Sequence, residues 1–111
     1  MAAYLLYICK DVTDRKELDT YWAKIGPTLE GSGAENLAVY TKLEVLEGNQ
    51  PVEGEVLTKF PSTEAAKAWY NSPEYVEVRQ HRTRGATYLG VLIEGGWLPP
   101  EQRMPHTKTN R

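Results

Sequence analysis

The fold follows from one stretch of the chain, Phe60-Pro61-Ser62-Thr63-Glu64-Ala65-Ala66-Lys67-Ala68-Trp69-Tyr70-Asn71-Ser72-Pro73-Glu74-Tyr75, which ends a strand, forms one helix, stops it and begins another. Ser72 is a good N-cap because its hydroxyl can accept a hydrogen bond from a free amide of the first helical turn. Pro73 fits the first helical position, where no amide hydrogen is missed. Because a proline disfavours helical geometry in the residue before it, the helix that begins near Ser62 should break at Ser72. The sequence therefore predicts two consecutive helices with a bend between them.

A strand and a helix are predicted before this stretch. Residues 4–10 contain β-branched and aromatic side chains and are apolar on both faces, so both faces of this strand should be covered. Asp14 and Glu17 have the spacing of a capping box at the start of a helix. That helix carries one apolar stripe, which consists of Leu18, Tyr21, Trp22, Ile25 and Leu29. Gly31-Ser32-Gly33 should end it.

Two strands lie between the helices and one follows them. Residues 37–45 alternate between apolar and polar side chains, which predicts a half-exposed strand, and residues 55–60 return as its hairpin partner. Residues 86–94 form a last strand that is apolar on both faces. This βαββαβ order predicts the α+β class and a ferredoxin-like fold with a four-stranded antiparallel sheet. We expect the first and last strands in the centre of the sheet and residues 37–45 at an edge.

The expected sheet has one face that its own helices do not cover. Two helices can cover only one face of a four-stranded sheet, so the apolar second face needs a partner. The same face of a second copy is the most economical partner, and the pair would form a dimeric α/β barrel. The self-association of this chain as a homodimer is therefore part of the fold prediction.

We place the domain at residues 1–96 and interpret residues 97–111 as a flexible C-terminal tail. The tail has no periodicity and ends polar and basic, which is typical of a poorly ordered terminus. In the alternative interpretation, Trp97 and Leu98 pack onto a neighbouring subunit.

The composition is that of a globular domain, with 41% apolar and 25% charged residues. The formal net charge of −2 does not suggest a nucleic-acid-binding protein. No apolar run reaches the ~20 residues of a membrane span, and no basic leader precedes the first strand. Cys9 is the only cysteine, which favours a reducing compartment. We therefore expect a cytoplasmic protein with no nucleic-acid or membrane partner.

Several blocks of this sequence occur together in a known family. They are Val45-Leu46-Glu47-Gly48, Phe60-Pro61-Ser62, Ala65-Ala66-x-Ala68-Trp69-Tyr70-x-Ser72-Pro73-Glu74-Tyr75 and Arg82. With these blocks the chain resembles, over roughly residues 4–94, the family of domains of unknown function that bears the number 1330, in the dimeric α/β-barrel superfamily. The resemblance implies a ferredoxin-like subunit whose sheet packs against that of a twin.

The resemblance leaves the activity open. The superfamily includes cofactor-free monooxygenases, muconolactone isomerase, proteins like olivetolic acid cyclase and haem enzymes, so its fold does not determine one function. Family members also tend to carry a Gly-Gly-Arg-like run where this chain has Gly33-Ala34-Glu35. The resemblance therefore does not extend to an anion site built on those arginines.

The densest cluster of candidate functional residues is Arg79-Gln80-His81-Arg82-Thr83-Arg84, near the end of the second helical segment. Arg82 and Arg79 are candidates to hold a carboxylate or phenolate of a substrate. The alternative is that these charges complement the helix dipole in solvent. His81, the only histidine of the domain, is a candidate general acid or base, and its alternative is a structural role.

Aromatic side chains with polar tips can line an apolar cavity and orient a planar ligand. The chain has many of them, namely Tyr7, Tyr21, Trp22, Tyr40, Trp69, Tyr70, Tyr75 and Tyr88. From this set we predict Tyr21 as a catalytic residue that exchanges a proton and Tyr75 as a substrate-binding residue. The alternative is core packing, which is strongest for Trp22 and Trp69.

The sequence contains no recognisable metal, nucleotide or nucleophile motif. It has one cysteine, no His-x-x-His spacing, no glycine-rich phosphate loop and no Gly-x-Ser-x-Gly run. We therefore expect an enzyme without cofactor or metal, an isomerase, cyclase or monooxygenase acting by acid-base chemistry on an aromatic, ketonic or lactone-like metabolite. The alternatives are a ligand-binding or stress-associated homodimer without chemistry and a purely structural module.

Overall fold

The computed structural model describes residues 1–104 and has the predicted βαββαβ order, with the second helical segment divided in two. Its elements are β1 (Ala3–Val12), α1 (Arg15–Thr28), β2 (Glu35–Val39), β3 (Gly54–Phe60), α2 (Thr63–Tyr70), α3 (Pro73–Gly85) and β4 (Ala86–Glu94), followed by a 3-10 turn at Pro100–Gln102. Residues 105–111 of the predicted flexible tail lie outside the described residues. The ferredoxin-like α+β prediction is confirmed.

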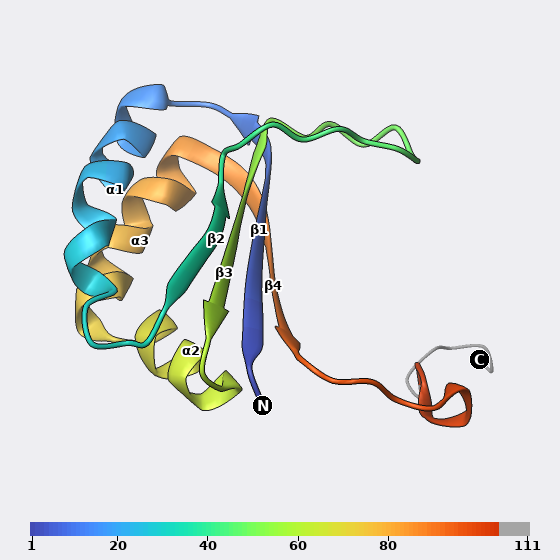
Figure 1. The fold of residues 1–111 in the computed structure, drawn as a ribbon. Coiled ribbons are helices and arrows are strands. Elements are labelled where there is room, and N and C mark those ends of the chain that lie inside the picture. Colours follow the sequence, from blue (N-terminus) through green and yellow to red (C-terminus); the bar gives the residue numbers. More distant parts are fainter. Residues whose placement is uncertain (105–111) are drawn as a thin grey trace.

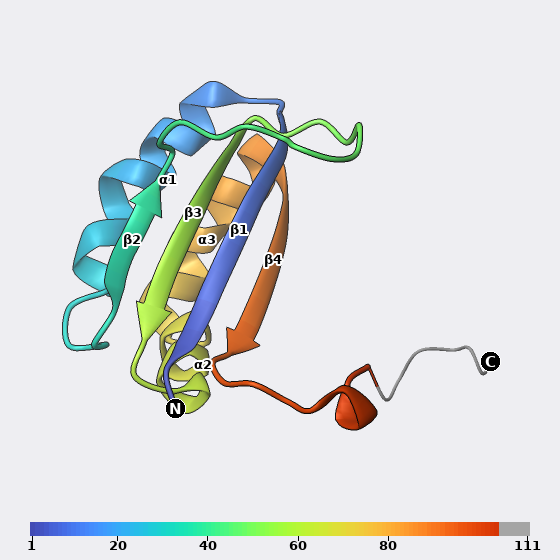
Figure 2. The same cartoon turned by 45° about the vertical axis from the view of Figure 1, so that its right-hand side comes forward.

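The four strands form one antiparallel sheet in the order β2-β3-β1-β4, and all three α-helices lie on one of its faces (Figures 1 and 2). β2 is at an edge, as predicted, but the prediction that the last strand is central is wrong because β4 is the other edge. Both faces of β4 are apolar for a different reason. Its odd-numbered residues Leu89, Val91 and Ile93 are more than a third exposed on the face away from the helices. The apolar residues on both faces of β4 thus indicate a sheet face that the helices do not cover, and not a central position of the strand.

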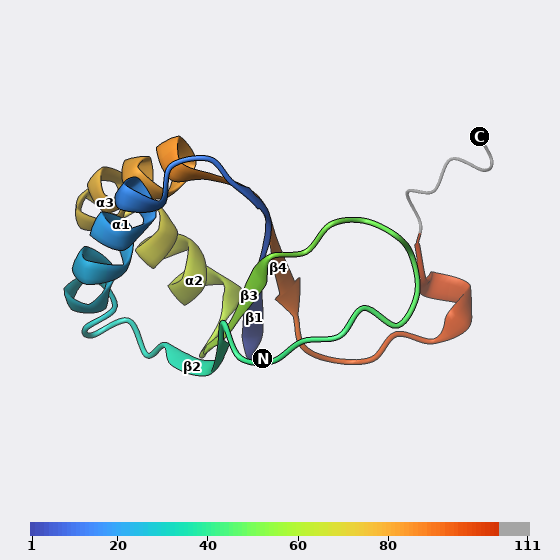
Figure 3. The same cartoon turned by 90° about the horizontal axis from the view of Figure 1, so that it is seen from above.

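The hairpin between β2 and β3 differs from the prediction. β2 ends at Val39 and not at position 45, and Tyr40 follows with a φ of 53°. Tyr40 turns its ring onto the backbone of Gly54, where a methyl group would lie 2.7 Å from the Tyr40 ring. This turn directs residues 41–53 out of the sheet as an extended arm on the side opposite the helices (Figures 1 and 3).

The helix starts follow the local sequence signals. The Ser72 hydroxyl accepts a hydrogen bond from the Tyr75 amide at 3.2 Å, so the predicted cap and break are confirmed. Asp14 caps α1 by accepting from the Lys16 amide at 3.1 Å. The reciprocal half of the predicted capping box does not form, because the Asp14 amide donates to the Gly85 carbonyl at 2.9 Å. The Glu17 carboxylate is therefore free for another partner.

The core lies between the sheet and the helices. Its largest fully buried side chains are Tyr75, Phe60, Leu18 and Cys9. Burial raises the pKa of the Cys9 thiol, as expected for a cysteine that packs as a small apolar residue. In the part of the chain that the structure describes, no helix has the length and apolar character needed to span a membrane.

Candidate functional site

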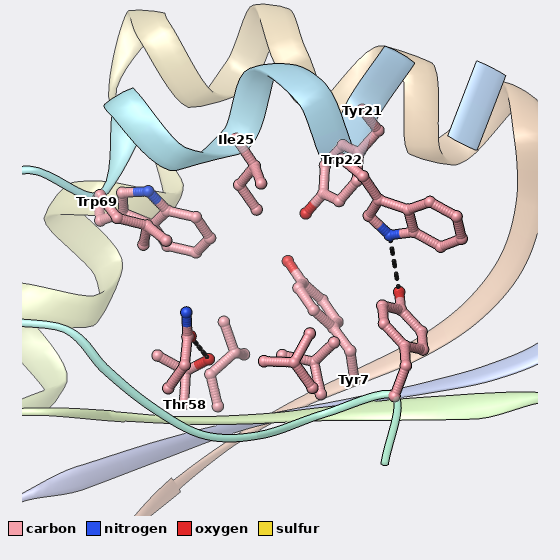
Figure 4. A pocket seen from close by; sticks show the side chains of 12 residues that line it. Tyr7, Tyr21, Trp22, Ile25, Thr58 and Trp69 are labelled. Carbon is pink, nitrogen blue, oxygen red and sulfur yellow. Dashed lines mark hydrogen bonds between the residues drawn. The ribbon is translucent and has the colours of Figure 1, made fainter. Parts of the chain in front are cut away.

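Three tyrosines from three different elements meet inside the core. The Tyr75 hydroxyl lies 2.9 Å from the Tyr7 hydroxyl and 2.8 Å from the Tyr21 hydroxyl. The three side chains are buried, with at most 5% of any of them exposed. Figure 4 shows Tyr7 rising from the sheet and Tyr21 descending from α1, with their hydroxyls directed toward each other. We call Tyr7, Tyr21 and Tyr75 the tyrosine cluster.

The sequence positions each member of the tyrosine cluster by simple periodicity. Tyr7 belongs to the alternate residues of β1 that face the helices, and Tyr21 lies on the buried side of α1. Tyr75 stands in the first turn of α3, which the Ser72 cap begins. Gly90 faces Tyr7 in the β1–β4 register, and a methyl group there would lie 2.8 Å from the Tyr7 ring. Glycine at position 90 thus makes room for Tyr7.

Arg82 lies beside the tyrosine cluster and is only 6% exposed. It occupies the inward side of α3 together with Tyr75 and Val78. Its guanidinium carbon lies 4.4 Å from the centre of the Tyr7 ring and 5.0 Å from that of Tyr88, which is the geometry of cation–π contacts. Its Nη2 donates to the Tyr7 hydroxyl over a long 3.5 Å.

The charge of Arg82 has no anionic partner. Among residues 1–104 the structure has two salt bridges, between Arg15 and Asp19 and between His81 and Glu17. The Nε of Arg82 is buried and has no hydrogen-bond acceptor. A buried guanidinium is ordinarily paired with a carboxylate because removing a charge from water is costly. Among residues 1–104, Arg82 is therefore a buried cation without a carboxylate partner.

The protonation states of the site follow from burial. Burial is the main cause that raises the pKa of Tyr7 and of Tyr21 well above the usual tyrosine range, and the neighbouring Tyr75 adds to it. Burial opposes the charged form of Arg82, whereas charge interactions with the surrounding tyrosines, which act once those tyrosines ionise, raise the pKa of the guanidinium. At neutral pH the site therefore contains one positive charge and neutral hydroxyl groups that can donate hydrogen bonds.

Arg82 lines a pocket that lies between the β4 side of the sheet and the helices α2 and α3. Its volume is about 540 Å³, and its lining residues include Leu5, Tyr7, Tyr70, Tyr88 and Leu92 besides Arg82. Pockets that bind small organic molecules commonly measure about 300–1,000 Å³ and have apolar walls with a few polar groups. We call this space the Arg82 pocket.

A second group of hydrogen-bonded side chains joins Tyr88, which contacts Arg82, to Tyr40 and Trp22. The Tyr88 and Tyr40 hydroxyls are hydrogen-bonded to each other, and the Trp22 indole donates to the Tyr40 hydroxyl at 3.3 Å. Burial and the bond to Tyr40 raise the pKa of Tyr88. Tyr40, the residue that turns the chain out of β2, is thereby fixed to the last strand.

The structure brings together three of the five residues that were predicted for the site. Tyr21, Tyr75 and Arg82 lie within one buried network. Arg79 lies at the edge of this network and is not fully buried, with its guanidinium 4.2 Å from the centre of the Tyr70 ring and 5.8 Å from that of Tyr75. His81 faces α1, where its Nδ1 lies 2.7 Å from the Glu17 carboxylate that the capping box does not use. The histidine is thus separated from the tyrosine cluster.

Two residues of the site were not singled out in the sequence. Tyr7 and Tyr88 appeared there only among the general aromatic residues, yet both contact Arg82. The available signal was strand alternation, which puts Tyr7 and Cys9 on one face of β1 and opposite Gly90 and Tyr88 of β4. For metal ions, the described residues contain no cluster of three or more His, Cys, Asp or Glu side chains.

Comparison with known proteins identifies a family and a fold. The family model described as "Domain of unknown function (DUF1330)" matches residues 2–96. No curated protein matches the chain. A solved protein of unknown function from Rhodopseudomonas palustris is 16% identical with a TM-score of 0.69, over 87% of this chain and 84% of that one.

Two other solved structures are informative about related folds. A dimeric ferredoxin-like protein of unknown function from Thermobifida fusca is 10% identical with a TM-score of 0.61, over 86% of this chain and 92% of that one. SnoaB, a cofactor-independent oxygenase from Streptomyces nogalater, is 9% identical with a TM-score of 0.57, over 89% and 97%. At these identities the similarity shows the ferredoxin-like fold and not the activity.

Proposed function

We propose that this chain, which belongs to the DUF1330 family, forms a cytoplasmic homodimer. The homodimer binds an anionic aromatic or enolisable metabolite against Arg82 and performs cofactor-free acid-base chemistry on it. The observation that carries the proposal is the buried guanidinium of Arg82, which lacks an anionic partner within residues 1–104 and lines a pocket of about 540 Å³. A ligand carboxylate, phenolate or enolate would provide the missing acceptor.

The chemistry that this site favours is stabilisation of negative charge. A preorganised cation and neutral hydroxyl donors in a buried site stabilise an oxyanion more strongly than water does. Arg82 and Tyr7 are the groups placed to do so, since Tyr7 and Arg82 line the same pocket. Tyr75 and Tyr21 would hold the Tyr7 hydroxyl in position through their hydrogen bonds.

The proposed reactions are isomerisation, cyclisation or oxygenation of a substrate that is itself acidic. Tyrosines with raised pKa values are poor general bases at neutral pH, and His81 of α3 is directed away from the pocket to Glu17 of α1. A neighbouring guanidinium lowers the pKa of an electron-poor phenol or a 1,3-dicarbonyl compound further, so such a substrate needs mainly stabilisation of its anion. The description of SnoaB as a cofactor-independent oxygenase supports such chemistry on this fold.

A second candidate is a homodimer that binds the same ligand without chemistry. It is favoured by the lack of a carboxylate or imidazole among the residues that line the Arg82 pocket. Turnover of a bound phenol or 1,3-dicarbonyl compound, followed by mass spectrometry, distinguishes the enzyme from this binding protein.

The homodimer is proposed from the uncovered sheet face. Leu6 pairs with Leu57 and Val91 across the strands, and Ile8 pairs with Leu89, so an apolar band crosses the sheet opposite the helices. The arm of residues 41–53 and the segment after β4 both project on this side (Figure 3). They carry exposed apolar side chains, namely Leu43, Val45, Leu46, Trp97 and Leu98. A second copy would bury this surface, as supported by the dimeric description of the Thermobifida fusca protein.

The binding proposal predicts selectivity for charge. We expect 2-naphthoate to bind roughly 10- to 100-fold more tightly than 2-naphthamide, because a charge-assisted hydrogen bond contributes about 1.5–3 kcal/mol. The two probes have the same rings and differ in the carboxylate that Arg82 would hold. Isothermal titration calorimetry measures both affinities. Equal affinities would contradict the proposal that Arg82 binds an anion.

A second prediction concerns pH. Arg82, Tyr7 and Tyr21 have raised pKa values, so their protons stay bound well above neutral pH. We therefore expect 2-naphthoate affinity to be constant from about pH 6 to pH 9, a range that lies below the ordinary tyrosine pKa of about 10. A loss of affinity centred near the ordinary histidine pKa of about 6.5 would instead assign the binding to His81.

A further inference from the structure

A second cavity, which shares Tyr7 with the Arg82 pocket, lies between α1 and the strands β2 and β3 (Figure 4). Its volume is about 80 Å³. Its walls include Tyr7, Tyr21, Ile25, Val56 and Trp69, and Val39 is among the exposed residues at its rim. Leu5 and Tyr7 also line the Arg82 pocket, so the two spaces share one wall. We call this space the apolar cavity.

Apart from the side-chain nitrogen of the exposed Asn36, the polar side-chain groups around the apolar cavity have partners within the protein. The Trp69 indole donates to the Thr28 hydroxyl at 3.1 Å, and the Thr58 hydroxyl donates to the Asn36 side chain at 2.9 Å. The Trp22 indole donates to Tyr40, and the Tyr7 and Tyr21 hydroxyls bond to Tyr75. The buried unpartnered side-chain atoms of the described residues are Glu55 Oε1 and Arg82 Nε, and neither residue lines this cavity.

This arrangement decides which molecules the apolar cavity can hold. A buried water needs about 2–4 polar partners, whereas a cavity without them stays dry and accepts apolar guests such as xenon. The volume of about 80 Å³ exceeds the roughly 10–15 Å³ that one water requires, so size does not exclude a small guest. Its walls therefore favour a guest without hydrogen-bonding groups.

We infer that the apolar cavity is a binding site for a small apolar molecule of the size of dissolved dioxygen. This inference stands without the proposed function, because it depends on walls that Arg82 does not form. Together the two sites would hold an anionic ligand and an apolar gas in two spaces that share Tyr7. That combination would favour oxygenation among the proposed reactions.

Xenon is the probe for this inference because it is apolar, small and chemically inert. We expect xenon under pressure to shift the methyl NMR signals of Ile25 and Val56 in a saturable way and to leave the methyl signals of Leu92 unchanged. The Val56→Phe variant, in which a ring fills the cavity from β3, should lose this response. Val39→Phe, at the more exposed rim, serves as a second variant if Val56→Phe does not fold.

The matched control is Leu92→Phe, which fills the Arg82 pocket from β4 and leaves the apolar cavity intact. Leu92→Phe should weaken 2-naphthoate binding and keep the xenon shifts. The cavity variant that folds, Val56→Phe or Val39→Phe, should keep 2-naphthoate binding and lose the xenon shifts. Xenon shifts that persist in the cavity variants, or water cross-peaks to the Val56 methyl groups, would overturn the inference. If neither the unchanged protein nor any variant binds 2-naphthoate, and the unchanged protein still shows the xenon response, only the proposed function is overturned.

Discussion

Replacing Arg82 by methionine should abolish the preference for 2-naphthoate and leave the folded protein slightly more stable. Loss of the guanidinium removes the group that holds the anion, so the roughly 10- to 100-fold preference over 2-naphthamide should disappear. Stability should rise by on the order of 1 kcal/mol, because the burial of an unpaired charge costs several kcal/mol and cation–π contacts offset only part of this. Calorimetric titration and urea unfolding measure the two effects.

The matched control for Arg82→Met is Arg84→Met. Arg84 lies in the last turn of the same helix, is exposed and bonds to Gln80, so its removal should alter neither affinity nor stability appreciably. If Arg82→Met instead unfolds the protein at lower urea concentration while the anion preference persists, Arg82 is a structural residue. Gain of stability with loss of binding is typical of a residue that is kept for function.

Placing a lysine at Val91 should convert the proposed homodimer into monomers of 12.6 kDa. Val91 lies on the uncovered face, in the middle of the edge strand β4 and opposite Leu6 in the register, and is 37% exposed. In a dimer this position would be buried, where an unpaired ammonium group costs several kcal/mol. Native mass spectrometry of the variant and the unchanged protein at equal concentration measures the shift.

Ala23→Lys adds the same charge on the exposed side of α1, on the helix face of the sheet, and should leave the dimer intact. A dimer that survives Val91→Lys but not Ala23→Lys would assign the interface to the helices. If the protein without any substitution is monomeric in native mass spectrometry, the proposal that a second copy covers the sheet is contradicted. Trimming the chain after Gly96 tests separately whether Trp97 and Leu98 add to the association.

Local signals were enough to predict the helices and the edge position of β2, but not the end of β2 or the edge position of β4. The break at Ser72 depends on a cap and a proline that act within a few residues. The end of β2 depends on Tyr40, whose side chain reaches Trp22 and Tyr88 far along the chain. The edge position of β4 likewise follows from pairing with β1 and from nothing within residues 86–94 themselves.

The candidate site was only partly predictable for a related reason. Tyr75, Val78 and Arg82 share one face of α3, so helical periodicity could have placed Arg82 in the core. His81 is next to Arg82 in sequence, but one residue turns a helix by about 100°, which directs His81 to Glu17 instead. The lack of a carboxylate beside Arg82 could not be read from the sequence, because it depends on which elements surround α3.

A crystal structure of the protein with 2-naphthoate would show whether Arg82 binds an anion. We predict electron density for the naphthyl ring between Leu92 and Tyr70 in the Arg82 pocket. The carboxylate should lie within hydrogen-bond distance of Arg82 Nε, which now has no acceptor. A naphthoate bound elsewhere, or bound in this pocket with its carboxylate turned away from Arg82, would contradict the account.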